Sequence, residues 1–110
     1  MNDVAYKILS ADEFADLQAG NFDGAPIDIA DGYIHLSTAL QLPATVEKHF
    51  AGRTDLIIAA IDLKALGKKI RWEMSRGDAL FPHLYGRLEA ANVIAAIPLF
   101  RHPDGSVALP

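Results

Sequence analysis

The segment Asp55–Leu63 (DLIIAAIDL) constrains the fold of this chain more than any other stretch. It is the most apolar run in the sequence, and polar turn residues flank it on both sides. The run is too short for a buried helix, whereas strands of this length are common. Because successive side chains of a strand point to opposite faces and both faces are apolar here, we expect a central strand covered on both sides.

Two helices are predicted in the first half of the chain. A strand over residues 4–9 leads into Ser10, which with Glu13 forms a capping-box pattern and predicts a helix over residues 11–19. Gly20 supplies the stop signal for this helix. Pro43 suits the first turn of a second helix, which should end near residue 51, before Gly52.

The stretch between the first helix and Asp31 shows no periodicity. Gly24 and Pro26 interrupt any regular element, so residues 21–31 are predicted to be an ordered loop. Loops in such positions often shape pockets.

The second half of the chain is rich in strand signals. Residues 70–74 alternate as a strand does. Residues 92–100 form a last long strand in which Pro98 implies an edge position or a bulge, and its Ile94 should be largely buried. Residues 75–89 are expected to be irregular apart from the stretch around His83, and residues 107–109 could add a hairpin strand. Because helices come early and strands late, the predicted class is α+β with a mixed or antiparallel sheet.

Length and composition indicate one domain over residues 1–110. A chain of 110 residues with 51% hydrophobic residues buries a core without metals or disulfides. The absence of cysteine excludes disulfides, thiolate catalysis and Cys-ligated zinc. The net charge of −4 argues against broad nucleic-acid binding. With no signal-like N-terminus and no long apolar run, we expect a cytoplasmic protein that does not enter membranes.

Two short motifs carry the polar chemistry of the sequence. In Asp31–Ser37 (DGYIHLS), alternation places Ile34 and Leu36 on a core face and Tyr33, His35 and Ser37 on the other face. The second motif, FPHLYG over residues 81–86, carries an imidazole and a phenol between Pro and Gly. We therefore expect the two motifs to form two walls of one cleft. A plainer alternative is that each His and Tyr is half buried, with its polar tip bonded to the backbone.

Familiar cofactor motifs are missing. Neither Gly-x-Gly-x-x-Gly nor a P-loop pattern occurs, and the histidines at 35, 49, 83 and 102 lack metal-ligand spacing. What remains is a metal-free polar cleft built from His35, Ser37, Glu73, His83 and Tyr85, with Arg71 or Arg87 nearby. Such groups can bind ribose hydroxyls, stack on a flat heterocycle and stabilise a cation.

The two motifs, with Trp72-Glu73 between them, resemble the DUF952 family of small bacterial proteins. The resemblance spans nearly the whole chain. It implies an ADP-ribosyltransferase-like fold, a split α+β sheet whose enzymes bind NAD or an ADP-ribose-like group in a cleft between half-sheets. It also implies that His35 and Ser37 hold a ribose and the nicotinamide side, and that Tyr85 or His83 stacks on nicotinamide. Enzymes of that fold usually carry a glutamate on a late strand, which residues 92–100 lack, so Glu73 or Glu89 would have to substitute.

Three functions follow as hypotheses. The first is an enzyme that cleaves or transfers ADP-ribose from NAD or a related nucleotide, the second is a non-catalytic module that binds a small molecule or nucleotide, and the third is an interaction domain with ordinary buried His and Tyr. The candidate catalytic residues are His35, Glu73 and His83. The candidate ligand-binding residues are Tyr33, His35, Ser37, Thr38, Arg71, Trp72, His83 and Tyr85.

Overall fold

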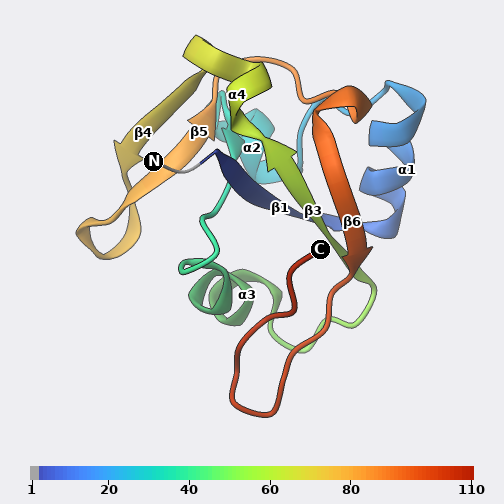
Figure 1. The fold of residues 1–110 in the computed structure, drawn as a ribbon, viewed down its shortest axis with the longest axis vertical. Helices are drawn as coiled ribbons and strands as arrows, with labels where there is room; N and C mark the ends of the chain where they lie inside the picture. Colours follow the sequence, from blue (N-terminus) through green and yellow to red (C-terminus); the bar gives the residue numbers. More distant parts are fainter. Residues whose placement is uncertain (1–2) are drawn as a thin grey trace.

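The run that dominates the sequence is the central strand of a three-stranded antiparallel sheet. In the computed structural model, which describes residues 3–110, β3 (Leu56–Asp62) lies between β1 (Val4–Ser10) and β6 (Val93–Pro98). Ala59 and Ile61 of β3 pack into one cluster of buried side chains, and Leu56 and Ile58 pack into another. The prediction of a central strand covered on both faces is confirmed, and Figure 1 shows β3 between its two neighbours.

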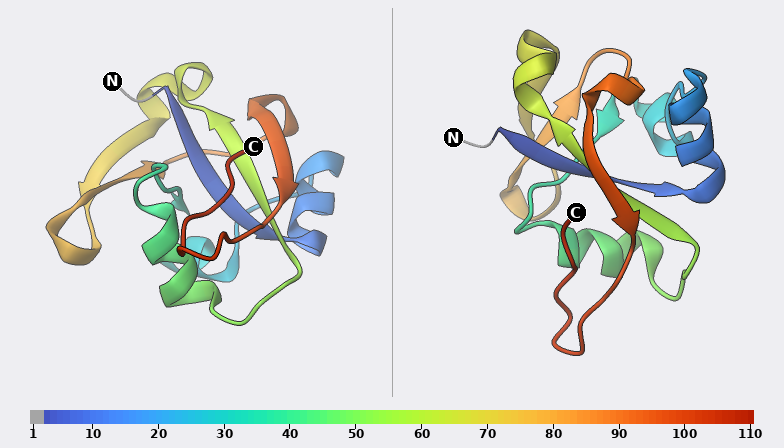
Figure 2. Two further views of the ribbon diagram at one scale, coloured as in Figure 1. Left: turned by 60° about the horizontal axis from the view of Figure 1, so that its bottom comes forward. Right: turned by 45° about the vertical axis from the view of Figure 1, so that its right-hand side comes forward.

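A second, smaller sheet carries both motifs. It is antiparallel with the order β2 (Ile34–His35), β5 (Leu80–Leu84) and β4 (Ile70–Met74). An isolated bridge between Tyr6 and Ser37 links it to β1 of the first sheet. The predicted α+β class is confirmed, with all strand pairs antiparallel. Figure 2 shows the β4–β5 hairpin extending away from the first sheet.

The early helices begin and end where the sequence signals them. In α1 (Ala11–Ala19), Ser10 and Glu13 form the reciprocal capping box, and Gly20 closes the helix with φ +81°. The second predicted helix is α3 (Leu42–Phe50), which buries Leu42 and Val46. Shorter helical segments follow: α4 (Leu63–Leu66), η1 (Gly67–Lys69), η2 (Arg76–Asp78) and η3 (Ala90–Asn92).

The predicted loop over residues 21–31 is wrong in its second half, where α2 (Pro26–Asp31) forms. Pro26 begins this helix instead of breaking a regular element, because a missing N–H costs nothing in the first turn. The Asp28 carboxylate accepts a hydrogen bond from the backbone N–H of Ala25, and Gly32 ends the helix in the left-handed conformation. No helix in the described part of the chain is long and apolar enough to cross a membrane.

Strand β5 falls on the stretch around His83 that was excepted from the irregular segment over residues 75–89. It covers residues 80–84 although Pro82 lies in its middle, and the carbonyl of Pro82 accepts a hydrogen bond from Leu36 N–H. Two other expectations need correction. At the other end of the chain, β6 is an edge strand as Pro98 implied, but Ile94 is 58% exposed. Residues 107–109 contribute a single bridge, from Val107 to Arg101, in place of a hairpin strand.

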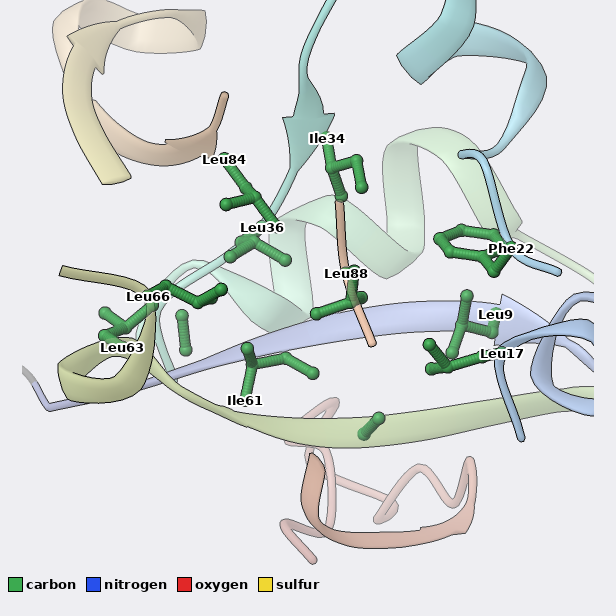
Figure 3. Packing of buried hydrophobic residues seen from close by; sticks show 12 residues of the cluster. Leu9, Leu17, Phe22, Ile34, Leu36, Ile61, Leu63, Leu66, Leu84 and Leu88 are labelled. Atoms are coloured by element: carbon green, nitrogen blue, oxygen red, sulfur yellow. The ribbon is translucent and has the colours of Figure 1, made fainter. Parts of the chain in front are cut away.

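The main core lies between the two sheets. Ile34, Leu36 and Leu84 come from the second sheet and its flanks, and they face Leu9 and Ile61 of the first (Figure 3). All five side chains are at most 4% exposed. The second sheet is therefore held by its apolar face, which leaves its other face available for polar side chains.

The two ends of the β3–β6 pair should differ in their sensitivity to truncation. Ile58→Ala removes a side chain with no exposed area and should lower the free energy of unfolding by about 2–5 kcal/mol. Ile94→Ala is the matched control and should cost under about 1 kcal/mol, because that side chain is mostly in solvent. Urea denaturation of both variants measures the difference, and equal losses would contradict the assignment of β3 as the buried strand.

Candidate functional site

The two motif histidines lie directly opposite each other. His35 of β2 pairs with His83 of β5, and their ring centroids are 5.5 Å apart. Tyr33 packs against both rings, stacked on His83 at 4.1 Å and tilted against His35 at 4.7 Å. All three side chains line a pocket of about 520 Å³, to which β1, α2 and α3 also contribute. The prediction that both motifs line one cleft is confirmed for His35 and Ser37 of the first motif and for His83 of the second, whereas Tyr85 does not line the pocket.

His83 is buried, with only one of its ring nitrogens bonded. Its exposed fraction is 2%, and its Nδ1 lies 2.8 Å from Oε1 of Glu73. The hydroxyl of Tyr85 donates to the same oxygen at 2.7 Å. The hydrogen bonds from His83 and Tyr85 lower the pKa of Glu73, and the bond to the carboxylate raises the pKa of Tyr85. Among the described residues, Nε2 of His83 is the buried side-chain polar atom without a hydrogen-bond partner.

These contacts fix the tautomer of neutral His83. An ionised carboxylate only accepts hydrogen bonds, so Nδ1 of His83 must carry the proton and donate it to Glu73. Nε2 then presents a lone pair, and the ring lies at the wall of the pocket. The arrangement leaves a buried acceptor that a donor group in the pocket would satisfy.

His35 is anchored more firmly than its place on the polar strand face suggested. Oδ1 of Asp28 accepts from both Nδ1 (2.7 Å) and the backbone N–H (3.0 Å) of His35. Nε2 of His35 lies 3.0 Å from Oδ2 of Asp31, a carboxylate that also lines the pocket. Both ring nitrogens thus have carboxylate partners, which makes His35 a poorer candidate for proton transfer than His83.

The buried negative charge of Asp28 is compensated by hydrogen bonds and by the positive charge of Lys7. It is 2% exposed, and its Oδ2 lies 2.8 Å from Nζ of Lys7, which is itself 5% exposed. Burial alone raises the pKa of Asp28, but the hydrogen bond from His35 and the charge and hydrogen bond of Lys7 outweigh it and lower the pKa to about 2. Lys7 also donates to the carbonyl of His35 at 3.0 Å.

Aromatic rings extend the site outward from His83. The Tyr85 ring lies 5.2 Å from that of Tyr33, and the guanidinium of Arg71 lies over Tyr85 at 4.6 Å. Burial and the negative charges of Asp31 and Glu73 raise the pKa of Tyr33. Ser37 is buried, lines the pocket and has its Oγ 3.2 Å from Oγ1 of Thr45 on α3.

Some predicted residues lie outside this cluster. Trp72 occupies the opposite face of β4 from Glu73, as strand alternation requires, and is 39% exposed. Thr38 exchanges hydrogen bonds with Gln41 and thereby orders the turn before α3. Arg87 binds Asp23 and the carbonyl of Gly20, and Glu89 precedes η3 at the surface. Of the two carboxylates proposed as substitutes for a late-strand glutamate, the structure brings only Glu73 to the site.

Sequence reasoning missed several residues that line or support the pocket. Asp28 and Asp31 belong to the unpredicted helix α2, and Thr45, Lys48 and His49 come from α3. One signal was available: Lys7 interrupts an apolar strand, and a buried lysine needs a carboxylate partner. Within the described residues, no cluster of three or more His, Asp or Glu side chains has an arrangement that could hold a metal ion.

Comparisons with known proteins place the chain in a family. The family described as "Protein of unknown function (DUF952)" matches residues 8–96, and the chain belongs to it. It is similar to the crystal structure of protein CC0527 from Caulobacter crescentus, with 40% identity, a TM-score of 0.85 and coverage of 96% of this chain and 93% of that one. The solution NMR structure of CC0527 gives 40% identity, a TM-score of 0.80 and coverage of 94% and 90%. No curated protein matches the chain.

The buried ion pair predicts a specific response to acid. Because the pKa of Asp28 is lowered from 3.8 to about 2 in the folded protein, its carboxylate stabilises the fold above about pH 4. This contribution, on the order of 2 kcal/mol, is lost as the pH falls through 2. Asp28→Asn should lower the free energy of unfolding at pH 7, since Lys7 loses its partner, and flatten its pH dependence between 4 and 2.

Chemical denaturation at several pH values measures this effect. Glu47→Gln is the control, because Glu47 is an exposed carboxylate of α3, and it should keep the slope of the wild-type protein. An Asp28→Asn variant with an unchanged slope would show that Asp28 does not carry the predicted coupling.

Proposed function

We propose that this member of the DUF952 family binds a ribosyl nucleotide such as NAD or ADP-ribose in the pocket between His35 and His83, and that it cleaves or transfers the ADP-ribosyl group. The observation that carries the proposal is the buried Nε2 of His83, a hydrogen-bond acceptor without a partner among the described residues, in a ring that lines the pocket. Leaving such an atom unsatisfied costs about 1–3 kcal/mol, so a ligand hydroxyl that donates to it gains that energy on binding.

The neighbouring side chains suit the rest of a nucleotide. Tyr33 offers an aromatic surface beside His83, and Asp31 offers a carboxylate at the pocket wall. Flat heterocycles stack on such rings, and a carboxylate stabilises a cation that develops nearby. The arrangement of two three-stranded antiparallel sheets is compatible with the split sheet of ADP-ribosyltransferase-like proteins, which supports the proposal by analogy.

The chemistry follows from the two histidine environments. When the bond between ribose C1′ and the nicotinamide nitrogen breaks, the bonding electrons leave with nicotinamide and C1′ takes on oxocarbenium character. Asp31, one of whose oxygens is bonded to His35, would stabilise that positive charge through its other oxygen. The attacking water or acceptor hydroxyl would replace the ribose hydroxyl at Nε2 of His83, form the new bond to C1′ and give its proton to that nitrogen. Glu73 holds the Nδ1–H of the same ring.

A non-catalytic binding role is the second candidate. Oε1 of Glu73 already accepts hydrogen bonds from both His83 and Tyr85, and β6 carries no glutamate. A carboxylate engaged in this way orients its neighbours instead of attacking a substrate. The same pocket would then hold a nucleotide or another small molecule with hydroxyl groups and leave it unchanged.

Ligand binding should depend on the outer nitrogen of His83. Wild-type protein at 100 times the dissociation constant of ADP-ribose should gain about 2.7 kcal/mol of stability, which a thermal-shift assay detects. His83→Asn places its amide near the position of Nδ1, so it can still donate to Glu73 but has no atom at Nε2; this variant should fold and lose the shift. His83→Gln restores a polar atom near Nε2 and should recover part of it.

His102→Ala is the control for general loss of a histidine, because His102 is exposed and outside the pocket. It should respond to ADP-ribose as the wild-type protein does. If NAD, ADP-ribose and nicotinamide all leave the wild-type melting temperature unchanged at millimolar concentrations, nucleotide binding in this pocket is excluded.

Catalysis should depend on the tautomer of His83. Glu73→Ala removes the acceptor that keeps the proton on Nδ1 of His83, so the ring can carry the proton on Nε2 and lose its proton acceptor. We expect kcat for nicotinamide release from NAD to fall about 10²–10⁴-fold while the ADP-ribose shift persists, because a ribose hydroxyl can accept from Nε2–H as well as donate to Nε2. Chromatography of released nicotinamide measures the rate, and binding of NAD by the wild-type protein without release would favour the binding module.

A further inference from the structure

The pocket has a second wall, formed by one face of α3. Thr45, Lys48 and His49 are spaced i, i+3 and i+4, so they share a helix face, and all three line the pocket. Leu42 and Val46 lie on the buried face of the same helix. Arg53, just beyond the helix, also lines the pocket and extends the polar wall.

The position of this wall is fixed by the fold. Oγ1 of Thr45 lies 3.2 Å from Oγ of Ser37, and the backbone of Ser37 exchanges hydrogen bonds with Tyr6 of β1. Ser37, which makes these contacts, lies two residues beyond His35 in the chain. One helical turn from Thr45, Lys48 therefore faces the same cavity as the histidine pair.

The charges on the pocket walls differ from those of the whole chain. The net charge of the chain is −4. Among the described residues, however, three cationic side chains (Lys7, Lys48 and Arg53) and only two carboxylates (Glu13 and Asp31) line the pocket. Both carboxylates are engaged, because Glu13 caps the backbone N–H of Ser10 and Asp31 pairs with His35. The positive charge at the α3 wall is therefore not neutralised by carboxylates of the pocket.

Lys7 is committed to Asp28, which leaves Lys48 and Arg53 for a ligand. Lys48 makes no ion pair within 4 Å with any described residue. Arg53 has an exposed partner, Asp55, at 3.4 Å; solvent screens surface pairs of this kind, so they hold the guanidinium only weakly. A cation in the last turn also offsets the helix dipole, but that effect does not account for Arg53, which lies outside α3.

We propose that the α3 wall is an anion subsite, in which Lys48 and Arg53 bind the phosphate groups of a ligand whose hydroxyl end lies at His83. This inference rests on the proposed function and adds the orientation of the ligand in the pocket. The ligand class becomes a phosphorylated ribosyl compound, with its phosphates at α3 and its sugar hydroxyls at the paired histidines. A neutral nucleoside or free sugar would use only half of the pocket.

The test compares ADP-ribose binding by titration calorimetry at low and high salt. Lys48→Ala should raise the dissociation constant of ADP-ribose roughly tenfold, because a charge-assisted hydrogen bond is lost. Lys48→Glu should raise it further, because charge repulsion then replaces that hydrogen bond. Arg53→Ala should act in the same direction. Lys64→Ala is the matched control, since Lys64 is an exposed lysine of α4 outside the pocket, and it should bind as the wild-type protein does.

Two independent readouts complete the design. Inorganic pyrophosphate should compete with ADP-ribose in the wild-type protein and should compete poorly in Lys48→Glu. Raising the salt concentration from about 50 to 300 mM should weaken wild-type binding and should have less effect on Lys48→Ala, because exposed charges are screened. Melting temperatures of the variants without ligand should match that of the wild-type protein, as Lys48 is exposed.

The possible failures are distinguishable. If ADP-ribose binding is lost in His83→Asn but is insensitive to salt and unchanged in Lys48→Glu and Arg53→Ala, the anion subsite is overturned and the proposed function stands. If the wild-type protein binds no ADP-ribose, or binds it equally well in His83→Asn, the proposed function is overturned and the subsite with it.

Discussion

The buried carboxylate of Asp28 is the interaction on which the geometry of the site depends. One of its oxygens accepts two hydrogen bonds from His35, and the other is bound by Lys7 and by the backbone of Ala25. It therefore ties together β1, the start of α2 and β2. A charge buried to this extent is tolerated only when every lone pair has a partner, and here the partners come from three separate segments. The position of His35 is a direct consequence of that requirement.

Asp28 also explains why the two histidines are unequal, although they face each other across one strand pair. His35 has carboxylates at both ring nitrogens, whereas His83 has Glu73 at one nitrogen and none of the described side chains bonded to the other. Both ring nitrogens of His35 are therefore occupied, whereas His83 keeps an acceptor without a partner among the described residues. Two identical side chains thus acquire different chemistry from their neighbours, as paired groups in enzyme sites commonly do.

The aromatic and apolar surroundings give this arrangement its rigidity. Leu36 and Leu84 hold the second sheet against the first, so the polar faces of β2 and β5 cannot move independently. Tyr33 packs against both histidine rings, and the hydroxyl of Tyr85 donates to Glu73. A site supported in this way on paired strands keeps its geometry without a ligand, which reduces the entropy that binding must overcome.

Features with a short-range cause could be predicted from the sequence. The capping box at Ser10 fixes the start of α1 because both partners lie within one turn. The alternation in Tyr33–Ser37 separates the core face from the site face, and the apolar run of β3 specifies the centre of the first sheet. The pairing of the motifs in one cleft also followed, from the similar chemistry of the two segments.

What the sequence by itself determined is therefore the set of elements and the polarity of their faces, since these depend on neighbours along the chain. Tertiary structure alone decided which polar groups meet. Helix α2 depends on a cap by Asp28 that is stabilised by Lys7, 21 positions away in the chain. Strand β5 contains Pro82 although β2 and β4 flank it, and the carbonyl of Pro82 is bonded to Leu36 N–H. The unpartnered Nε2 of His83 and the cationic wall of α3 likewise arise from segments that only the packed core brings together, because contacts between distant segments leave no periodic signal in the sequence.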